Sequence, residues 1–449
     1  APSWYMAIPN QKFSGLKGIT RPIGSGGIAD FYAMHPITPN IRQVDVFGGY
    51  TAAAGHYLYT ARAFPQEYWN RAVLINEPTG KLIGLGFLEK DGAGFVTKDG
   101  WTLLASADEW VAPVHAQVGP DGAVWVLDWY DFIVQHNPTP EGFETGEGNA
   151  YVTDLRDKER GRIYRIVYKN APRSAPLSLS KDDPDGLVEA LKNDNMLWRL
   201  TAQRLLVERG ETDVVPALIA LVEDNSVDAL GLNGAACHAL WTLKGLGVLD
   251  NANGAAYQAA VRALRHPAAG VRKAAVQVLP RTESTREALL EAGLLSDSDL
   301  HTRLAAVLAL SEMPASQEVG RRLYEMSGDR EVYADRWLSR AVYVAAAAHA
   351  DGFLEAYRAD PGAMDVNALS ASLRLSEERP SWETLGQEEL AGLPTMTLPG
   401  RWEEQGLEDL DGYVWYMAIV EGSTSGATLH LGAIDDNDET WVNGVQVGA

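Results

Sequence analysis

Polar residues that could do chemistry gather in one apolar stretch, residues 110–137, which is otherwise built largely of Trp, Val, Leu, Ile and Phe. His115 and Gln117 stand just before a predicted strand. An imidazole there could serve as a general base, because the pKa of histidine lies near neutrality. Asp128 and His136 flank the next loop and could form a pair in which the carboxylate orients the ring. His115, Asp128 and His136 are therefore candidate catalytic residues, and the alternative is that they fasten loops to a sheet.

A tight turn in the same stretch could hold a cofactor. The sequence Gly119-Pro120-Asp121-Gly122 could offer backbone carbonyls to Ca²⁺, a hard cation that takes oxygen ligands. With Gln117, the residues Gly119 and Pro120 are the candidate cofactor-binding positions. The same tripeptide PDG is also a common hairpin turn, which is the alternative interpretation.

An acidic cluster near the C-terminal end suggests a carbohydrate site. Asp436 and Asp438 lie beside Trp441. Carboxylates next to an indole can bind sugar hydroxyls while the ring stacks on the sugar face. The alternative is an acidic loop between strands, with Trp441 in a sandwich core. The three residues are the candidate carbohydrate-binding positions, and the chain offers no comparable cluster for a transition metal.

The first 170 residues are typical of β structure. Short runs rich in aromatic and β-branched residues alternate with the turn signals PTG, KDG and PDG, as in "LINEPTGKLIGLGFLEKDGAGFVTKDGWTLL". This pattern predicts antiparallel hairpins, repeated closely enough for a sandwich or for the blades of a propeller. In the last run, "GRIYRI", Arg162 is expected to tie the strand to an acidic loop.

An internal repeat of helix pairs follows. Five segments align in register on Arg199, Asn233, Arg272, Arg303 and Arg336, at spacings of 34, 39, 31 and 33 residues. A shorter amphipathic segment precedes each of them, and helix pairs at this period stack into an α-solenoid because none can bury its apolar stripe alone. The aligned arginines predict a ladder of hydrogen bonds between repeats rather than a catalytic row. His238, His266 and His301 have no ligand spacing and are expected to be structural.

Length, charge and cysteine content exclude several classes of protein. At about 150 residues per domain, 449 residues predict roughly three domains. The 38 Lys and Arg against 60 Asp and Glu give a net charge of -22, which repels nucleic acid and anionic lipid. The single cysteine, Cys237, excludes an intrachain disulfide, a CxxCH haem site and cysteine-based zinc sites. No apolar run approaches the roughly 20 residues of a membrane-spanning helix.

Three motifs in the first region carry a family resemblance. The stretches "GHYLYTARAFPQEYWNRAVLINEPTGKLIG", "GPDGAVWVLDWYDFIVQHNPTP" and "LRDKERGRIYRIVY" resemble the last blades of the glucose/sorbosone-dehydrogenase-like β-propellers, a family of membrane-associated or secreted proteins in which HEAT repeats usually follow. The C-terminal stretch from "PGRWEEQGLEDLDGYVWY" to "LHLGAIDDNDETWVNGVQVG" is similar to the β-galactosidase-type jelly-roll of sialate O-acetylesterases.

The resemblance implies carbohydrate oxidation with electron transfer. In related soluble quinoproteins, pyrroloquinoline quinone (PQQ) and Ca²⁺ lie at the top of the propeller with a base histidine from an earlier blade. That base would fall before residue 1, so the chain is expected to be a piece of a longer protein whose partner is a cytochrome c domain or protein. Whether this chain is itself an enzyme is left open.

The predicted fold is multidomain, with β, α and β parts in that order. It consists of a partial β-propeller over 1–170, a linker over 171–184, a HEAT-like α-solenoid over 185–360, a linker over 361–380, and the start of a jelly-roll sandwich over 381–449. The preferred function is part of a secreted or periplasmic sugar-dehydrogenase-like protein. The alternative is a non-catalytic scaffold that docks proteins on the solenoid and holds glycans on the jelly-roll.

Overall fold

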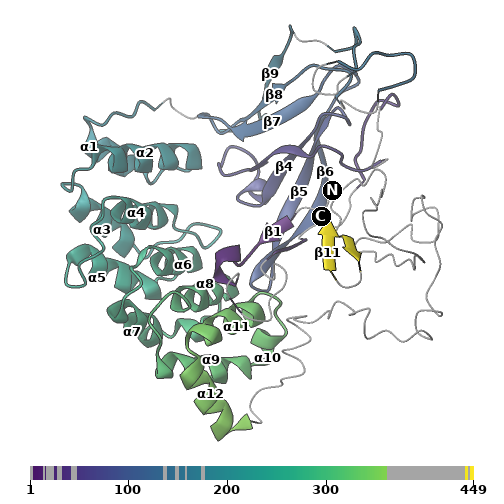
Figure 1. The fold of residues 1–449 in the computed structure, drawn as a ribbon. Coiled ribbons are helices and arrows are strands. Elements are labelled where there is room, and N and C mark those ends of the chain that lie inside the picture. Colours follow the sequence, from purple (N-terminus) through teal and green to yellow (C-terminus); the bar gives the residue numbers. More distant parts are fainter. Residues whose placement is uncertain are drawn as a thin grey trace. The chain divides into compact units, whose positions relative to one another are not determined.

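The structure is a computed structural model of the 449-residue chain. It describes residues 4–13, 16, 25–27, 33–41, 48–134, 139–146, 151–156, 159–172, 177–361, 440–442 and 445–448. The chain divides into two compact units, Ala1–Leu375 and Ser376–Ala449. The first unit contains antiparallel sheets followed by helices, so the fold combines β and α structure as predicted (Figure 1).

Two antiparallel sheets form what is called here the β part. Their strands are β3 (Ala54–Leu58), β4 (Ala72–Glu77), β5 (Leu82–Asp91) and β6 (Gly94–Ala105) in one sheet, and β7 (Pro113–Val118), β8 (Val124–Asp128) and β9 (Arg162–Ile166) in the other. In both sheets the strand order follows the sequence. Further strands, β1 (Trp4–Met6) and β2 (Ser25–Gly27), pair with each other near the N-terminus.

The two sheets pack through one shared apolar cluster. On β8 the side chains alternate, since Val124 and Val126 are fully buried while Trp125 and Leu127 are exposed. The buried side chains meet Leu74 and Leu85 of the first sheet. This period of two is what strands with one covered face require, and it leaves the opposite face of the β7–β8–β9 sheet in contact with solvent.

Hairpin turns fall at three of the four turn tripeptides. PTG joins β4 to β5, and PDG joins β7 to β8 with Gly122 at a φ of 76°. Of the two KDG tripeptides, the first ends at Gly92 and makes the β5–β6 turn. The second, residues 98–100, does not turn the chain, so reading it as a turn is wrong. It lies inside β6, where a bulge absorbs the glycine and pairing with β5 resumes at Thr102.

Twelve helices are assigned within the described residues, and together they are called here the helical array. They are α1 (Pro184–Ala190), α2 (Met196–Arg209), α3 (Val215–Glu223), α4 (Gly234–Gly245), α5 (Ala255–Arg262), α6 (Ala269–Val278), α7 (Glu283–Glu291), α8 (Leu300–Leu310), α9 (Gln317–Ser327), α10 (Arg330–Tyr333), α11 (Leu338–Ala348) and α12 (Ala350–Ala359). Helices form at every segment of the predicted repeat. Side chains such as Asn195, Asn233 and Asp299 begin them by accepting hydrogen bonds from the first free N–H groups.

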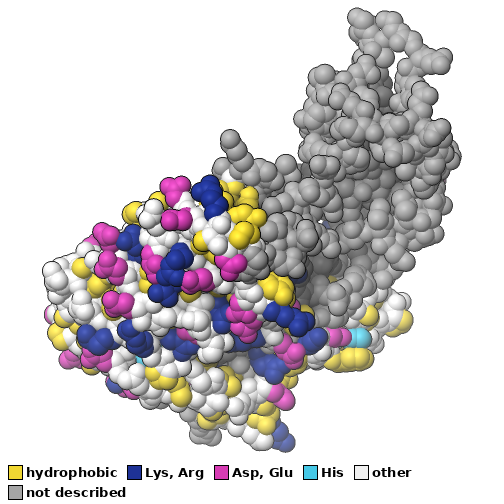
Figure 2. Space-filling model, turned by 90° about the horizontal axis from the view of Figure 1, so that it is seen from below, with side chains coloured by type: hydrophobic (Ala, Val, Ile, Leu, Met, Phe, Trp, Pro, Cys, Tyr) yellow, Lys and Arg dark blue, Asp and Glu magenta, His cyan; other side chains and the backbone are white. Residues whose placement is uncertain are grey.

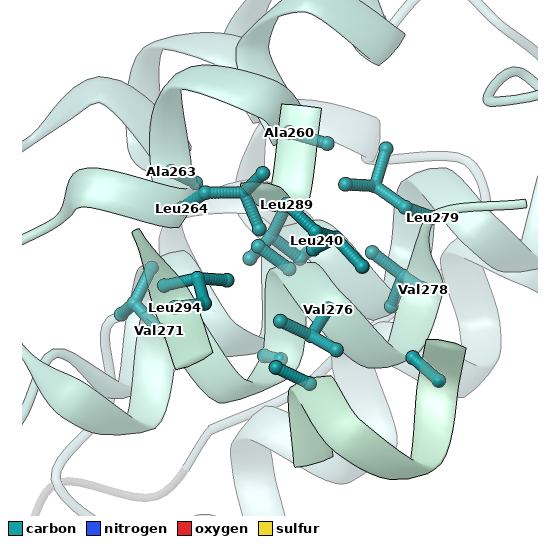
Figure 3. Close-up of a cluster of buried hydrophobic side chains, with 14 of the residues drawn as sticks. Leu240, Ala260, Ala263, Leu264, Val271, Val276, Val278, Leu279, Leu289 and Leu294 are labelled. Carbon is teal, nitrogen blue, oxygen red and sulfur yellow. The ribbon is translucent and has the colours of Figure 1, made fainter. Parts of the chain in front are cut away.

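Successive helices bury a continuous apolar core. The helices α2, α4, α6, α8 and α11 pack one on the next along the array. Figure 3 shows Leu240, Leu264, Val276 and Leu289, which come from consecutive segments, pointing into one cluster. Because each helix contributes only a few of these side chains, the core is completed only by stacking.

The predicted arginine ladder is present in the middle of the array. Arg272 binds both carboxylate oxygens of Asp297 at 2.7 Å, and the carbonyl of Asp297 accepts a hydrogen bond from Arg303 at 2.7 Å. Arg303 then reaches Glu331 at 2.9 Å. Arg199, Arg272 and Arg303 each also bind the carbonyl six residues before them. The ladder therefore links three successive segments, and the last predicted arginine, Arg336, instead lies over the Trp337 ring.

The surface of the array carries charges of both signs. On the face shown in Figure 2, Lys and Arg side chains are interspersed with Asp and Glu. On α9, for example, Arg321 and Arg322 both pair with Glu318. Acidic side chains such as Glu318 therefore have basic neighbours that partly neutralise their charge.

The second unit contains one described hairpin. Strands β10 (Thr440–Val442) and β11 (Val445–Gly448) pair in antiparallel fashion, with Val442 opposite Val445. The predicted turn residues between them, Asn443 and Gly444, lie outside the described residues, as does most of 381–449. The predicted domain boundaries stay predictions.

Candidate functional site

His115 and Gln117 lie on the solvent side of the β7–β8–β9 sheet. His115 is half-buried and pairs across the ladder with Leu127, and Gln117 is exposed and pairs with Trp125. No hydrogen bond or ion pair involves the His115 ring within the part of the chain that the structure describes. The imidazole is half-buried beside Gly55, and its described neighbours supply no group that would orient it as a base.

Asp128 is buried at the end of β8, and its carboxylate accepts hydrogen bonds that hold the local structure. One carboxylate oxygen accepts hydrogen bonds from the backbone N–H of Ala112 at 2.7 Å and of Tyr130 at 2.9 Å. The other accepts from the Tyr164 hydroxyl at 2.8 Å. Asp128 therefore holds the loop after β8 against two neighbouring segments. Its proposed partner, His136, lies outside the described residues.

The carbonyls of Gly119 and Pro120 face the helical array. The Gly119 carbonyl accepts a hydrogen bond from the Asn195 side chain at 2.8 Å, and the Pro120 carbonyl accepts one from the Trp198 indole at 2.9 Å. Both donors belong to the start of α2. The turn therefore joins the sheet to a helix, and these two oxygens already have donors within the chain.

The oxygen atoms of the candidate residues decide whether Ca²⁺ fits this region. Calcium needs about six to eight oxygen ligands that are not engaged elsewhere. The oxygens of Gly119, Pro120 and Asp128 are hydrogen-bonded within the protein. Among the described residues no group of three or more His, Cys, Asp or Glu side chains is placed to hold a metal ion. The candidate set therefore does not fit the cation as it stands, and no step through it is derived.

A buried lysine beneath the same loop escaped the sequence analysis. Lys81 is 2% exposed and donates from its ammonium to the carbonyls of Asp131 and Phe132, each at 3.2 Å. Burial lowers the pKa of Lys81 to about 8, although Asp131 and Asp128 act in the opposite direction. Lys81 directly follows PTG in the turn between β4 and β5. Because turn residues are usually exposed, nothing in the sequence indicated that this charge is buried.

Aromatic rings and cations stack over this lysine. The Arg162 guanidinium lies 3.5 Å from the centre of the Tyr130 ring, and Trp110 is 6.0 Å from Tyr130 and 6.1 Å from Phe132. Lys81 lies 5.6 Å from the Phe132 ring. The three tilted rings have a cation at each end and are called here the aromatic column. The cations are attracted to the negative faces of the rings, and this attraction stabilises the arrangement.

The column holds an unusual backbone. Tyr130 has a φ of 59°, a left-handed conformation that costs a non-glycine residue about 1–2 kcal/mol. Arg162 is itself fixed by an ion pair with Asp108 at 3.1 Å, which confirms the predicted tie between this strand and an acidic loop. The loop after β8 is thus held in its conformation by several independent contacts.

One family model covers this region. Residues 11–170 match a domain of unknown function (DUF7133). The match spans the β part, ends before α1, and covers roughly a third of the chain. A search of curated proteins finds no match. The family model supplies no reaction for the β part.

The remaining predicted residues fall elsewhere. Asp436 and Asp438 lie outside the described residues, and Trp441 lies in β10, paired with Gln446. In the array, the rings of His238 and His266 bond to Gln203 and to the Asp224 carbonyl, in keeping with a structural role. No described helix is long and apolar enough to cross a membrane.

Proposed function

We propose that this chain is a non-catalytic binding scaffold, in which the helical array holds the β part and offers its surface to protein partners. The observation that carries the proposal is the use made of the β-part loops. Three of the candidate site residues, Gly119, Pro120 and Asp128, instead fasten the β part to the helices or to itself.

One set of fastening contacts lies at the start of the array. Besides the bonds from Asn195 and Trp198, the backbone N–H of Met196 donates to the Thr60 carbonyl at 3.2 Å. Arg62 pairs with Asp228, in the loop before α4, at 3.2 Å. The β part is therefore joined to two consecutive helix pairs at this end.

A second set lies further along the array, at α8 and before α11. The tip of the β5–β6 hairpin meets α8 and α11, where His301 binds the Gly94 carbonyl at 2.8 Å and Lys90 pairs with Asp299 at 2.6 Å. Asp335 accepts a hydrogen bond from the Ala93 N–H at 2.8 Å. Two attachments this far apart along the array remove the hinge that a single linker would leave.

The proposal also extends to the fold type of each part of the chain. The sheets are proposed to be blades of a partial β-propeller, the array a HEAT-like solenoid, and the C-terminal region a jelly-roll that binds glycans through Asp436, Asp438 and Trp441. These assignments are supported by the sequence resemblance and by the predicted repeat. A periplasmic or secreted location follows from the same resemblance.

A sugar-dehydrogenase-like protein is the second candidate. It is favoured by the His115 ring, which no described hydrogen bond engages, and by three motifs that resemble that family in one order along the chain. In a complete protein PQQ and Ca²⁺ would then accept hydride from a carbohydrate, and a cytochrome would accept the electrons. The quinone and calcium contacts would have to come from residues other than the carbonyls of Gly119 and Pro120.

Dye reduction separates the two candidates. The purified chain, and the complete reading frame that contains it, are supplied with PQQ, Ca²⁺, an artificial electron acceptor and a panel of aldoses. We expect no PQQ-dependent dye reduction in either protein. Reduction that His115→Ala abolishes and Lys98→Ala leaves intact would overturn the scaffold and establish the dehydrogenase, because Lys98 is an exposed residue of β6 outside the candidate site.

A further inference from the structure

We propose that Trp101, with His35 and Asp99, forms a binding subsite for a neutral pyranose ring. The subsite combines Trp101 and Asp99 of β6 with His35, and it includes none of the candidate residues named above. The proposal goes beyond the scaffold function, which needs no ligand at this position.

Trp101 is exposed in a way that its strand does not require. The side chain is 62% exposed, and the residue has a φ of 70°. Between the pairs Gly84–Thr102 and Gly86–Asp99, the two residues Gly100 and Trp101 stand opposite Leu85 alone. This is a β-bulge, a device that re-aims a side chain at the cost of local pairing.

The backbone conformation and the exposure of Trp101 are each unfavourable for stability. A left-handed tryptophan costs about 1–2 kcal/mol of backbone strain, and an exposed indole forgoes the free energy of burial. A glycine at the same position would avoid both. Strain of this kind is concentrated at sites that contact ligands, and Trp101 is therefore better explained by binding than by packing.

Neighbouring side chains fix the orientation of the indole. The His35 ring stacks on it with centroids 3.5 Å apart and planes 10° from parallel. Asp99 accepts a hydrogen bond from the Trp101 N–H at 2.9 Å, and its other oxygen is 3.5 Å from the His35 ring. Since imidazole covers one face, the large exposed fraction must come mainly from the other face and the ring edges.

The chemistry of this face favours a neutral sugar. The negative face of an indole attracts the electropositive C–H groups that line one side of a pyranose ring. The Asp99 carboxylate, half-exposed beside it, can accept hydrogen bonds from the sugar hydroxyls. The same carboxylate and the net charge of -22 oppose an anionic ligand. A quaternary ammonium ion would need a cage of several rings, and the described contacts of Trp101 provide a single stacked partner.

Native affinity electrophoresis of the whole chain tests the subsite. Gels contain hydroxyethyl cellulose, soluble xylan or laminarin as neutral glycans, with polygalacturonate as the anionic comparison. We expect at least one neutral glycan to retard the wild type, and Trp101→Ala to weaken that retardation at least tenfold in apparent Kd. Trp125→Ala is the matched control, because Trp125 is also a partly exposed strand tryptophan, at 38%.

Three results would overturn the subsite. They are a wild type that no neutral glycan retards, retardation by polygalacturonate alone, and equal retardation of the wild type and Trp101→Ala. If retardation is instead lost in Trp441→Ala alone, glycan binding belongs to the C-terminal region and the scaffold proposal survives without this subsite. Thermal unfolding of Trp101→Ala serves as the folding check, and its Tm should stay close to that of the wild type, because the side chain removed is largely exposed.

Discussion

Lys81 is the most deeply buried ammonium group of the described β part, and its two carbonyl partners belong to the loop that carries the aromatic column. Lys81→Met keeps most of the side-chain volume but removes the hydrogen bonds that the ammonium donates to the carbonyls of Asp131 and Phe132. Removing one partner from a buried polar set is strongly destabilising. We expect the free energy of unfolding to fall by about 2–4 kcal/mol, measured by urea denaturation.

The matched control for this variant is Lys98→Met, which removes an exposed lysine from β6. Surface substitutions of this kind change stability by about 0.5 kcal/mol or less. Equal urea midpoints for the two variants would show that Lys81 does not anchor the loop. A shifted Tyr130 environment in Lys81→Met, seen as changed near-ultraviolet circular dichroism, is expected alongside the loss of stability.

At the scale of single residues, sequence predicted which positions are polar but not what they contact. Asp128 stands out because it ends an apolar strand, yet its three donors come from Ala112, Tyr130 and Tyr164. Two of these lie 16 and 36 residues away along the chain. Lys81 gave no signal, because a lysine after PTG is ordinary at a turn and only tertiary packing buries it.

At the scale of helices, a histidine couples α2 to α4. The His238 ring lies 2.7 Å from the Gln203 side-chain oxygen, and burial lowers the pKa of His238 to about 4, with Arg199 acting in the same direction. In the unfolded chain His238 therefore binds a proton below about pH 6.5, whereas in the folded chain it binds one only below about pH 4. Stability is lost as the pH falls through this window.

The loss attributable to His238 is up to about 3 kcal/mol, at 1.36 kcal/mol for each pKa unit. We expect His238→Gln to show a shallower decline in unfolding free energy between pH 7 and pH 4.5 than the wild type. Burial also lowers the pKa values of His301 and His349, so part of the slope will persist. Parallel pH profiles for the variant and the wild type would contradict the assignment.

Elements with a strong period were predicted best. The recurrence of apolar residues every three to four positions located a helix at each segment of the repeat, because stacked helices need a continuous apolar stripe. The second KDG was misread because a turn tripeptide and a bulge have the same composition. What distinguishes them is whether the partner strand continues opposite, and the sequence of β6 alone does not contain that information.

At the scale of the whole first unit, the attachment of the β part to the array is testable through Asp335. One of its oxygens accepts from the Trp337 and Leu338 N–H groups at the start of α11, and the other accepts from Ala93. Gly92 turns the hairpin beside it with a φ of 57°, and a side chain there would collide with this carboxylate. Asp335→Ala removes both the helix cap and the attachment.

We expect the wild type to unfold in one transition, seen at the same urea concentration by helical circular dichroism and by tryptophan fluorescence. Asp335→Ala should lose about 2 kcal/mol and separate the two signals. Asp183→Ala is the control, because Asp183 caps α1 and its described side-chain hydrogen bond stays within that helix. Coincident transitions in Asp335→Ala, equal to those of the control, would contradict rigid attachment.

The two attachments of the β part also have an elastic consequence. A free stack of helix pairs can be stretched like a spring, because each pair contacts only its neighbours. Here the sheets span from the start of α2 to the start of α11 and are bonded at both places. A pulling force between these points must strain the hydrogen-bonded strands as well as the helix stack, so this segment should behave as a stiff strut rather than as a compliant spring.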